Sequence, residues 1–252
     1  MIKTSRNTIL TAILLLSALC VGACADRSDP NPLPDFSIHT DVKQKKMAFF
    51  NYISPLINEQ NQLIRDQRER LLVLAGTASE NQNKADQKFI TELAGYYKVD
   101  AESLNKTVIE TLLLRVDQVP ASLALAQAAM ESAWGTSRFA VQANNLFGQW
   151  CYEEGCGLVP LRRNAGSKHE VAKFDSVSNA IRSYLRNINT HRAYSDLREH
   201  RAILRDEGKT VSGHLLAENL IDYSEMREAY VHEIQAVIRI NKLGQYDSDL
   251  TQ

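Results

Sequence analysis

The chain lacks any excess of charge and contains little cysteine, glycine or proline. Its 252 residues include 29 Lys and Arg against 30 Asp and Glu, so the formal net charge is −1. A chain without a basic excess is poorly suited to neutralise phosphates, and nucleic acid is therefore not an expected partner. Eleven glycines and six prolines exclude collagen-like and low-complexity chains, whereas 44% apolar residues support a folded core.

The four cysteines form two close pairs, one near the N-terminus and one in the middle of the chain. Neither pair has the two-residue spacing of zinc ribbons or thioredoxin-like sites. Two histidines, His169 and His191, have no third ligand at a suitable spacing. We therefore predict no metal and no cofactor.

Long apolar runs are absent except at the N-terminus, where residues 9–19 follow a short basic region. This run is too short to cross a membrane comfortably and is typical of a secretory signal. Residues 21–24, Val-Gly-Ala-Cys, resemble the lipobox of bacterial lipoproteins, which implies cleavage after residue 23 and acylation of Cys24. We therefore expect a lipid-anchored protein of the Gram-negative periplasm, at the outer membrane. The alternative is an uncleaved anchor helix.

The remaining chain divides into four segments. Residues 24–40 contain three of the six prolines and are expected to form a tether. Apolar residues at helical spacing predict an N-terminal helical buttress over 41–114, in which Ser54-Pro55 indicates the start of a new helix. The main body of the chain follows over 115–243, and a tail over 244–252.

Glu131 is the candidate general acid. It ends a helix that is predicted to start after Pro120 and that is apolar almost all round, which is typical of a buried helix. Desolvation and the negative end of the helix dipole both raise the pKa of a carboxyl at this position. A carboxyl that stays protonated near neutral pH can donate a proton, although most glutamates at helix ends are solvated and inert.

Residues 144–150, Asn-Asn-Leu-Phe-Gly-Gln-Trp, bring amides and aromatic rings close to Glu131 in the sequence. Sugars bind through hydrogen bonds to amides and through stacking of their apolar faces on aromatic rings. The alternative for each of Trp134, Phe147 and Trp150 is a place in the core.

Two blocks carry a family resemblance: residues 126–137, Ala-Gln-Ala-Ala-Met-Glu-Ser-Ala-Trp-Gly-Thr-Ser, and residues 144–148, Asn-Asn-Leu-Phe-Gly. Together they resemble the glucosaminidase family of peptidoglycan hydrolases, glycoside hydrolase family 73, and the wider stretch is similar to its Bax subgroup. The resemblance covers about residues 115–243 and implies that they form the catalytic domain. It also implies a lysozyme-like, mainly α (α+β) fold with a small β-hairpin lobe. It also implies a monomeric endo-β-N-acetylglucosaminidase that cleaves β-1,4 bonds after N-acetylglucosamine (GlcNAc) in peptidoglycan strands.

The resemblance also suggests site residues. It makes Glu170, on the expected hairpin, the candidate second carboxylate; Glu153, Glu154 and Asp175 are rivals of Glu170. It makes Tyr194 a residue that either orients the substrate acetamido group or stabilises positive charge at the anomeric carbon. Because N-acetyl sugars can use their own amide as nucleophile, a second carboxylate is not obligatory. The expected substrate-binding residues are Gln127, Trp134, Asn145, Phe147, Gln149, Trp150 and Tyr223.

Two further expectations follow. Cys20 leaves with the signal peptide, and Cys151 and Cys156 pair as a disulfide in the oxidising periplasm. The competing functions are a lytic transglycosylase or muramidase-like enzyme and a non-catalytic wall-binding lipoprotein.

Overall fold

The computed structural model describes residues 29, 31–78, 81–161, 163, 166–221 and 228–247, and the structural statements below concern these residues. All of the helices and strands belong to one compact unit, residues 31–252. The predicted signal peptide, the lipidation site Cys24 and the predicted substrate contact Tyr223 lie outside the described residues. Among the helices that are described, none is both long enough and apolar enough to cross a membrane.

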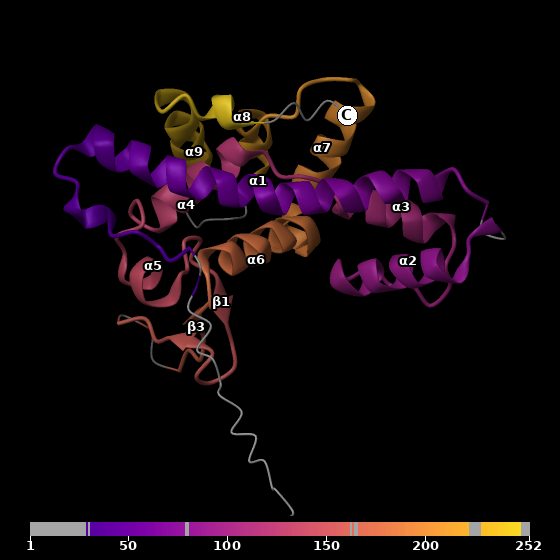
Figure 1. Ribbon diagram of the computed structural model, residues 1–252, viewed down its shortest axis with the longest axis horizontal. Coiled ribbons are helices and arrows are strands. Elements are labelled where there is room, and N and C mark those ends of the chain that lie inside the picture. Colours follow the sequence, from indigo (N-terminus) through magenta and orange to yellow (C-terminus); the bar gives the residue numbers. More distant parts are fainter. Residues whose placement is uncertain are drawn as a thin grey trace, which may run out of the picture. The chain divides into compact units, whose positions relative to one another are not determined.

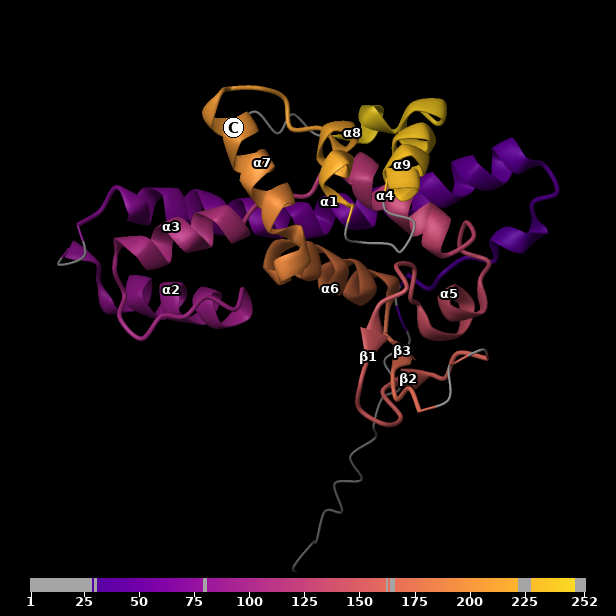
Figure 2. The ribbon, with the colours of Figure 1, turned by 180° about the vertical axis from the view of Figure 1, so that it is seen from behind.

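Helix α1, Val42–Ala75, is a single element of 34 residues that spans the molecule in both views (Figures 1 and 2). Its first turn is capped by Asp41, whose carboxylate accepts a hydrogen bond from the amide of Gln44 at 2.7 Å. The prediction of a new helix at Ser54-Pro55 is wrong, because Pro55 lies inside α1. Pro55 removes the amide partner of the Asn51 carbonyl, but both residues are exposed, so water can replace the lost hydrogen bond.

The other helices pack around α1. Helices α3, α4 and α6 all contact it, and the η5 turn, α8 and α9 contact α4. Figure 1 shows α2 and α6 on one side of α1 and α7, α8 and α9 on the other. The bounds are α2 Lys84–Tyr96, α3 Lys106–Arg115, α4 Ala121–Glu131, α5 Arg138–Ala143, α6 Val177–Thr190, α7 Ser195–Asp206, α8 Gly213–Leu216, α9 Glu228–Ile240 and the 3-10 turns η1 Phe36–Ile38, η3 Arg192–Tyr194, η4 Ala217–Asn219 and η5 Leu243–Tyr246.

Helix α4 is the buried centre of the domain, as its apolar sequence predicts. Every residue from 121 to 129 is buried. Its N-cap, Pro120, offers no side-chain acceptor. Asp247 supplies one instead, and its carboxylate accepts from the amide and the hydroxyl of Ser122, both at 2.7 Å. The segment that we expected to be a tail thus begins with residues that close the α4 end, since η5 also packs on α4.

Helix α7 was not predicted from the sequence. Its residues Arg201 and Arg205 both reach Asp117, in the segment before α4, and Arg205 holds that carboxylate with two hydrogen bonds of 2.6 and 2.7 Å. Arg201 is fully buried. The buried face of α7 is therefore partly made of paired charges rather than apolar side chains.

A small sheet forms the second lobe. Strands β1 (Trp150–Cys151), β2 (Gly157–Leu158) and β3 (Glu170–Ala172) are antiparallel in the order β1-β3-β2. The sequence analysis predicted a β-hairpin lobe that carries Glu170, and the structure adds a third strand, with Glu170 in the central strand β3. A Cβ on Gly157 would lie 2.0 Å from the carbonyl oxygen of Val171, so only glycine allows this close pairing. The predicted fold class, mainly α with a small β lobe, is confirmed.

Candidate active site

Glu131 is the last residue of α4, and the backbone turns sharply after it. Ala133, Trp134 and Gly135 have positive φ values of 50°, 61° and 76°. Two features require glycine at position 135. Its backbone is left-handed, which favours glycine, and a Cβ there would lie 2.5 Å from the Phe36 ring. The turn ends the helix before the chain can bury Glu131, whose side chain is exposed to solvent.

A chain of hydrogen bonds holds the Glu131 carboxylate. The hydroxyl of Tyr230, on α9, donates to Glu131 Oε1 at 3.0 Å. Gln127 Nε2 donates to the same Tyr230 oxygen at 3.1 Å, and the hydroxyl of Tyr184, on α6, donates to Gln127 Oε1 at 2.5 Å. Gln127 is fully buried one helical turn before Glu131. The structure thus places this predicted substrate contact behind the carboxylate, where it aligns Tyr230.

Desolvation is the main cause that raises the pKa of Glu131, and the hydrogen bond from Tyr230 partly opposes it. The sequence predicted this direction. Burial, followed by the charge of Glu131, keeps Tyr230 protonated by raising the pKa of its phenol. Tyr230 therefore remains a hydrogen-bond donor whether Glu131 is charged or neutral.

Two further residues lie close to the carboxylate. Gly148 passes so near that a Cβ there would be 3.6 Å from Glu131 Oε2. Tyr194 is buried in η3, and both burial and the charge of Glu131 raise the pKa of its phenol, so the two groups are within electrostatic reach. The structure thus brings together the predicted residues Glu131 and Tyr194.

Asn145 organises the loop that carries Gly148. Its side-chain amide donates to the carbonyls of Gln149 and Ala172, both at 2.8 Å, and its oxygen accepts from the amides of Phe147 and Gln149. Asn145 is buried, so it ties the loop to strand β3. Phe147 is buried as well and stacks on Tyr184 at 4.0 Å between ring centroids. Both predicted substrate contacts therefore support the site from behind.

The other predicted contacts have different surroundings. Trp134 packs on Phe49 and Phe50 of α1, with ring centroids 5.9 and 5.4 Å away. The Gln149 side chain, which is partly buried, bonds to Ser183 and the carbonyl of Ala180. Trp150 is 57% exposed and stacks on His169 at 4.2 Å. Of the two tryptophans, Trp150 is thus the one that offers an open aromatic surface.

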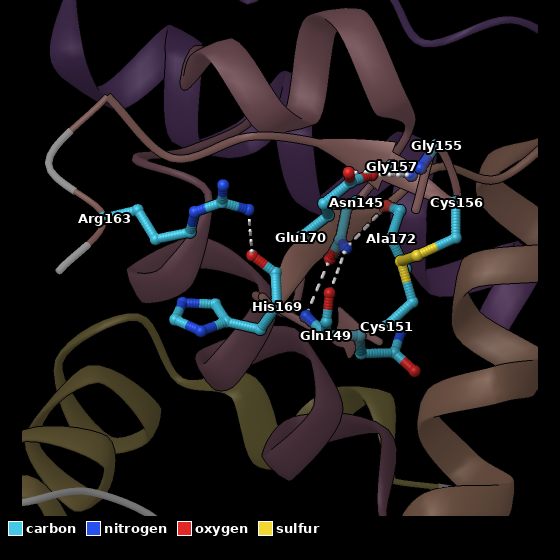
Figure 3. The surroundings of a disulfide bond; sticks show 10 residues. All are labelled: Asn145, Gln149, Cys151, Gly155, Cys156, Gly157, Arg163, His169, Glu170 and Ala172. Carbon is cyan, nitrogen blue, oxygen red and sulfur yellow. Dashed lines mark hydrogen bonds between the residues drawn. A yellow bond between two sulfur atoms is a disulfide. The ribbon is translucent and has the colours of Figure 1, made fainter. Parts of the chain in front are cut away.

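Glu170 lies in the β lobe beside the Cys151–Cys156 disulfide (Figure 3). Its carboxylate points to the turn between the two cysteines and accepts from the amides of Gly155, at 3.1 Å, and Gly157, at 2.8 Å. These two hydrogen bonds lower the pKa of Glu170. The two sulfurs and this carboxylate lie together, but paired sulfurs are not thiolates and so are not metal ligands.

Tyr230 and Tyr184 are the residues that the sequence reasoning missed as parts of the site. Tyr230 stands 99 residues after Glu131, and no local pattern connects them. In the sequence, a tyrosine that bonds to a carboxylate on another helix occupies the same kind of inward-facing helical position as a tyrosine of the core. Only the packing of α4, α6 and α9 distinguishes them.

The fold and site define a class: a lysozyme-like, mainly helical glycan hydrolase with one partly desolvated carboxyl. The comparisons agree. The family profile named Glucosaminidase, described as mannosyl-glycoprotein endo-beta-N-acetylglucosaminidase, matches residues 111–243. Protein bax of Escherichia coli (strain K12) is 32% identical over 211 residues, which are 83% of this chain and 74% of that protein. No solved structure gives a significant match. The chain belongs to the glucosaminidase family and is Bax-like.

Proposed function

We propose that the protein is a peptidoglycan hydrolase, an endo-β-N-acetylglucosaminidase that cleaves β-1,4 bonds after GlcNAc. The observation that carries the proposal is the Glu131 carboxyl, which is open to solvent and yet has a raised pKa. A raised pKa favours the protonated carboxyl, which can deliver its proton to a leaving group. Membership of the glucosaminidase family supports a glycan as the substrate.

In this mechanism Glu131 protonates the glycosidic oxygen as its bond to the anomeric carbon breaks. Tyr230 occupies Oε1, so Oε2, on the Gly148 side, presents the proton. Gly148 has no side chain, which leaves room there for the substrate. After the leaving group departs, the ionised Glu131 takes a proton from the water that completes hydrolysis.

We assign the attack on the anomeric carbon to the acetamido oxygen of the substrate. Both oxygens of Glu170, the predicted second carboxylate, already accept backbone amides, and the residue is only 6% exposed. Tyr194, whose phenol pKa is raised by burial and by the charge of Glu131, is the predicted residue to orient the acetamido group. The substrate amide then forms a cyclic intermediate that the Glu131-activated water opens.

Digestion of purified peptidoglycan by the full chain, followed by mass analysis of the products, tests the proposal. We expect fragments with GlcNAc at the reducing end, and none from the Glu131→Gln protein. Anhydro-muramic acid ends would instead indicate a lytic transglycosylase. Binding of peptidoglycan without cleavage would indicate a non-catalytic wall-binding protein.

We also propose that the enzyme works from the membrane of the cell envelope, held by acyl chains on Cys24. The lipobox-like residues 21–24 support this location. More than one acyl chain gives stable anchoring, because each buried methylene contributes about 0.8 kcal/mol. Mass spectrometry of the membrane fraction should find acylated Cys24, and Cys24→Ser should release the protein. A Cys24→Ser protein that stays in the membrane would contradict this assignment.

A further inference from the structure

Helices α2 and α6 lie on the same side of α1 (Figure 1). Residues of these three helices, together with the segment just before α6, line a groove of about 570 Å³. Its floor is formed by the buried residues Gln60, Ile64, Tyr97 and Leu185. The Arg186 guanidinium lies over the Tyr96 ring, 4.7 Å from its centroid, and Nε donates to the Tyr96 carbonyl at 2.8 Å. This contact joins the N-terminal helices to α6 and fixes one wall of the groove.

The residues that line the groove carry a local excess of positive charge, although the chain as a whole has none. Lys173, Arg182 and Arg186 line it, against the single acid Asp175. Within the described part of the chain, none of these three cations takes part in an ion pair. Lys173 and Arg182 are exposed to solvent, so both are available to an anion.

The groove adjoins the predicted sugar-binding surface. A second pocket, of about 210 Å³, is lined by Gln149, Trp150 and Lys98, and it shares Ser183 and Arg186 with the groove. Ser183 also donates to Gln149 Oε1 at 2.7 Å. A ligand that reaches past Trp150 along α6 therefore enters the groove.

We propose that this groove is a subsite for the stem peptide of peptidoglycan, with Lys173 and Arg182 binding its carboxylates. The inference rests on the proposed function, since it assumes a glycan strand near Trp150. Stem peptides combine several carboxylates with small methyl side chains. The cations suit the carboxylates, and the apolar residues Ile64 and Leu185 suit the methyl groups. The N-terminal helix α1 thus contributes Ile64 to the peptide subsite in addition to supporting the catalytic domain.

Binding of paired glycan oligomers tests the subsite. One oligomer carries tetrapeptides; the other has lost them to an amidase and keeps only its lactyl carboxylates. Calorimetry on the full chain, in the Glu131→Gln background to prevent cleavage, should show about tenfold tighter binding of the peptide-bearing oligomer, which lies within the range that two exposed charge pairs are expected to give. The double variant Lys173→Gln/Arg182→Gln should reduce this ratio to about one.

The matched control is Lys84→Gln/Arg239→Gln, which removes two exposed cations that do not line the groove. We expect it to keep the tenfold ratio. Equal affinity of the parent protein for both oligomers, an unchanged ratio in the groove variant, or an equal loss in the control would each overturn the subsite. Hydrolysis of the peptide-free oligomer by the unmutated chain reports separately on the proposed function. A protein that cleaves neither oligomer but keeps the tenfold ratio would refute the enzyme and leave the subsite standing.

Discussion

Glu131 and Glu170 are both glutamates, but their surroundings shift the pKa of the carboxyl in opposite directions. At the end of α4, desolvation raises the pKa of Glu131 against one phenol hydrogen bond. In the β lobe, two backbone amides lower the pKa of Glu170. The first environment favours the protonated acid and the second favours the anion.

The contrast supports our proposal that Glu131 is the reactive carboxyl and Glu170 a structural one. Glu131 has one oxygen free of any hydrogen bond described in the site, and it is exposed. Glu170 uses its two oxygens to hold the backbone on either side of Cys156, at Gly155 and Gly157. Nearness of a second carboxylate in the sequence is therefore weaker grounds for catalysis than the partners that it already has.

The largest expected effect is that of Glu131→Gln. Removal of the proton donor should lower kcat/KM by about 10²-fold or more in a peptidoglycan-clearing assay. The amide oxygen can still accept from Tyr230, so the fold should be retained. Because the folded pKa of Glu131 is raised, its ionised form lowers stability at neutral pH, and the thermal midpoint of the variant should not fall.

Retained activity in Glu131→Gln would break the comparison at once, because Glu131 would then be no more reactive than Glu170. A fall in the melting temperature of the variant at pH 7 would contradict the desolvation of Glu131 separately from its role in catalysis.

Tyr230→Phe should have the next largest effect, with kcat reduced by about tenfold. A hydrogen bond to a charged group contributes roughly 1.5–3 kcal/mol. Only part of this energy aligns the acid for catalysis, so the expected loss in rate is modest. The lost bond stabilised the ionised carboxylate, so the pKa of Glu131 should rise further. The alkaline limb of the pH–rate profile should therefore move to higher pH.

Tyr246→Phe is the matched control, since Tyr246 packs on Phe50 away from this hydrogen-bond chain. Its pH–rate profile should match that of the unmutated chain. An alkaline limb that moves to lower pH in Tyr230→Phe would show that the phenol does not act on the charged form of Glu131.

Glu170→Gln should lower activity by less than tenfold. Its folded pKa is lowered, so Glu170 contributes stability above the unfolded pKa of a glutamate, about 4.3. That contribution is lost as pH falls through the folded pKa. Thermal melts between pH 7 and pH 3 should therefore decline less steeply for the variant than for the unmutated chain. A loss of a hundredfold in rate would instead make Glu170 the second catalytic carboxylate.

Removal of the disulfide should have the smallest effect. Cys151→Ser/Cys156→Ser frees a short loop, for which chain entropy predicts a cost of about 2 kcal/mol, and activity should fall only a few-fold because Glu170 still holds the turn. Unfolding in urea measures the cost. A reductant should lower the stability of the unmutated chain and leave the variant unchanged; equal sensitivity of both proteins would contradict this role.

The site was predictable where it depends on local sequence and not where it depends on packing. The apolar sequence predicted a buried helix that ends at Glu131, and α4 does so; the same residue lies in the family motif. Neither could reveal Tyr230, which reaches Glu131 from a helix 99 residues away. Burial of Asn145 and Phe147 was equally invisible, because amides and aromatic rings suit a sugar surface and a rigid loop alike.

The same limit applies to the fold. Helix α7 escaped prediction because Arg198 and Arg201 occupy buried positions that an amphipathic pattern reserves for apolar residues. Pro55 suggested that one helix ends and another begins there. The helix continues instead, because Pro55 and Asn51 are exposed and water can replace the lost hydrogen bond. The cationic groove brings Lys173 into one cavity with Arg182 and Arg186 of α6, so net charge could not reveal it.

The most direct test of the contrast is a carbon-detected NMR titration of the Glu131 and Glu170 carboxyls in the folded protein. Single Gln variants assign the two signals. The structure predicts that Glu131 titrates above the ordinary glutamate pKa and Glu170 below it. Equal pKa values for the two residues, or the reverse order, would contradict the assignment of Glu131 as the proton donor and of Glu170 as the residue that holds the lobe.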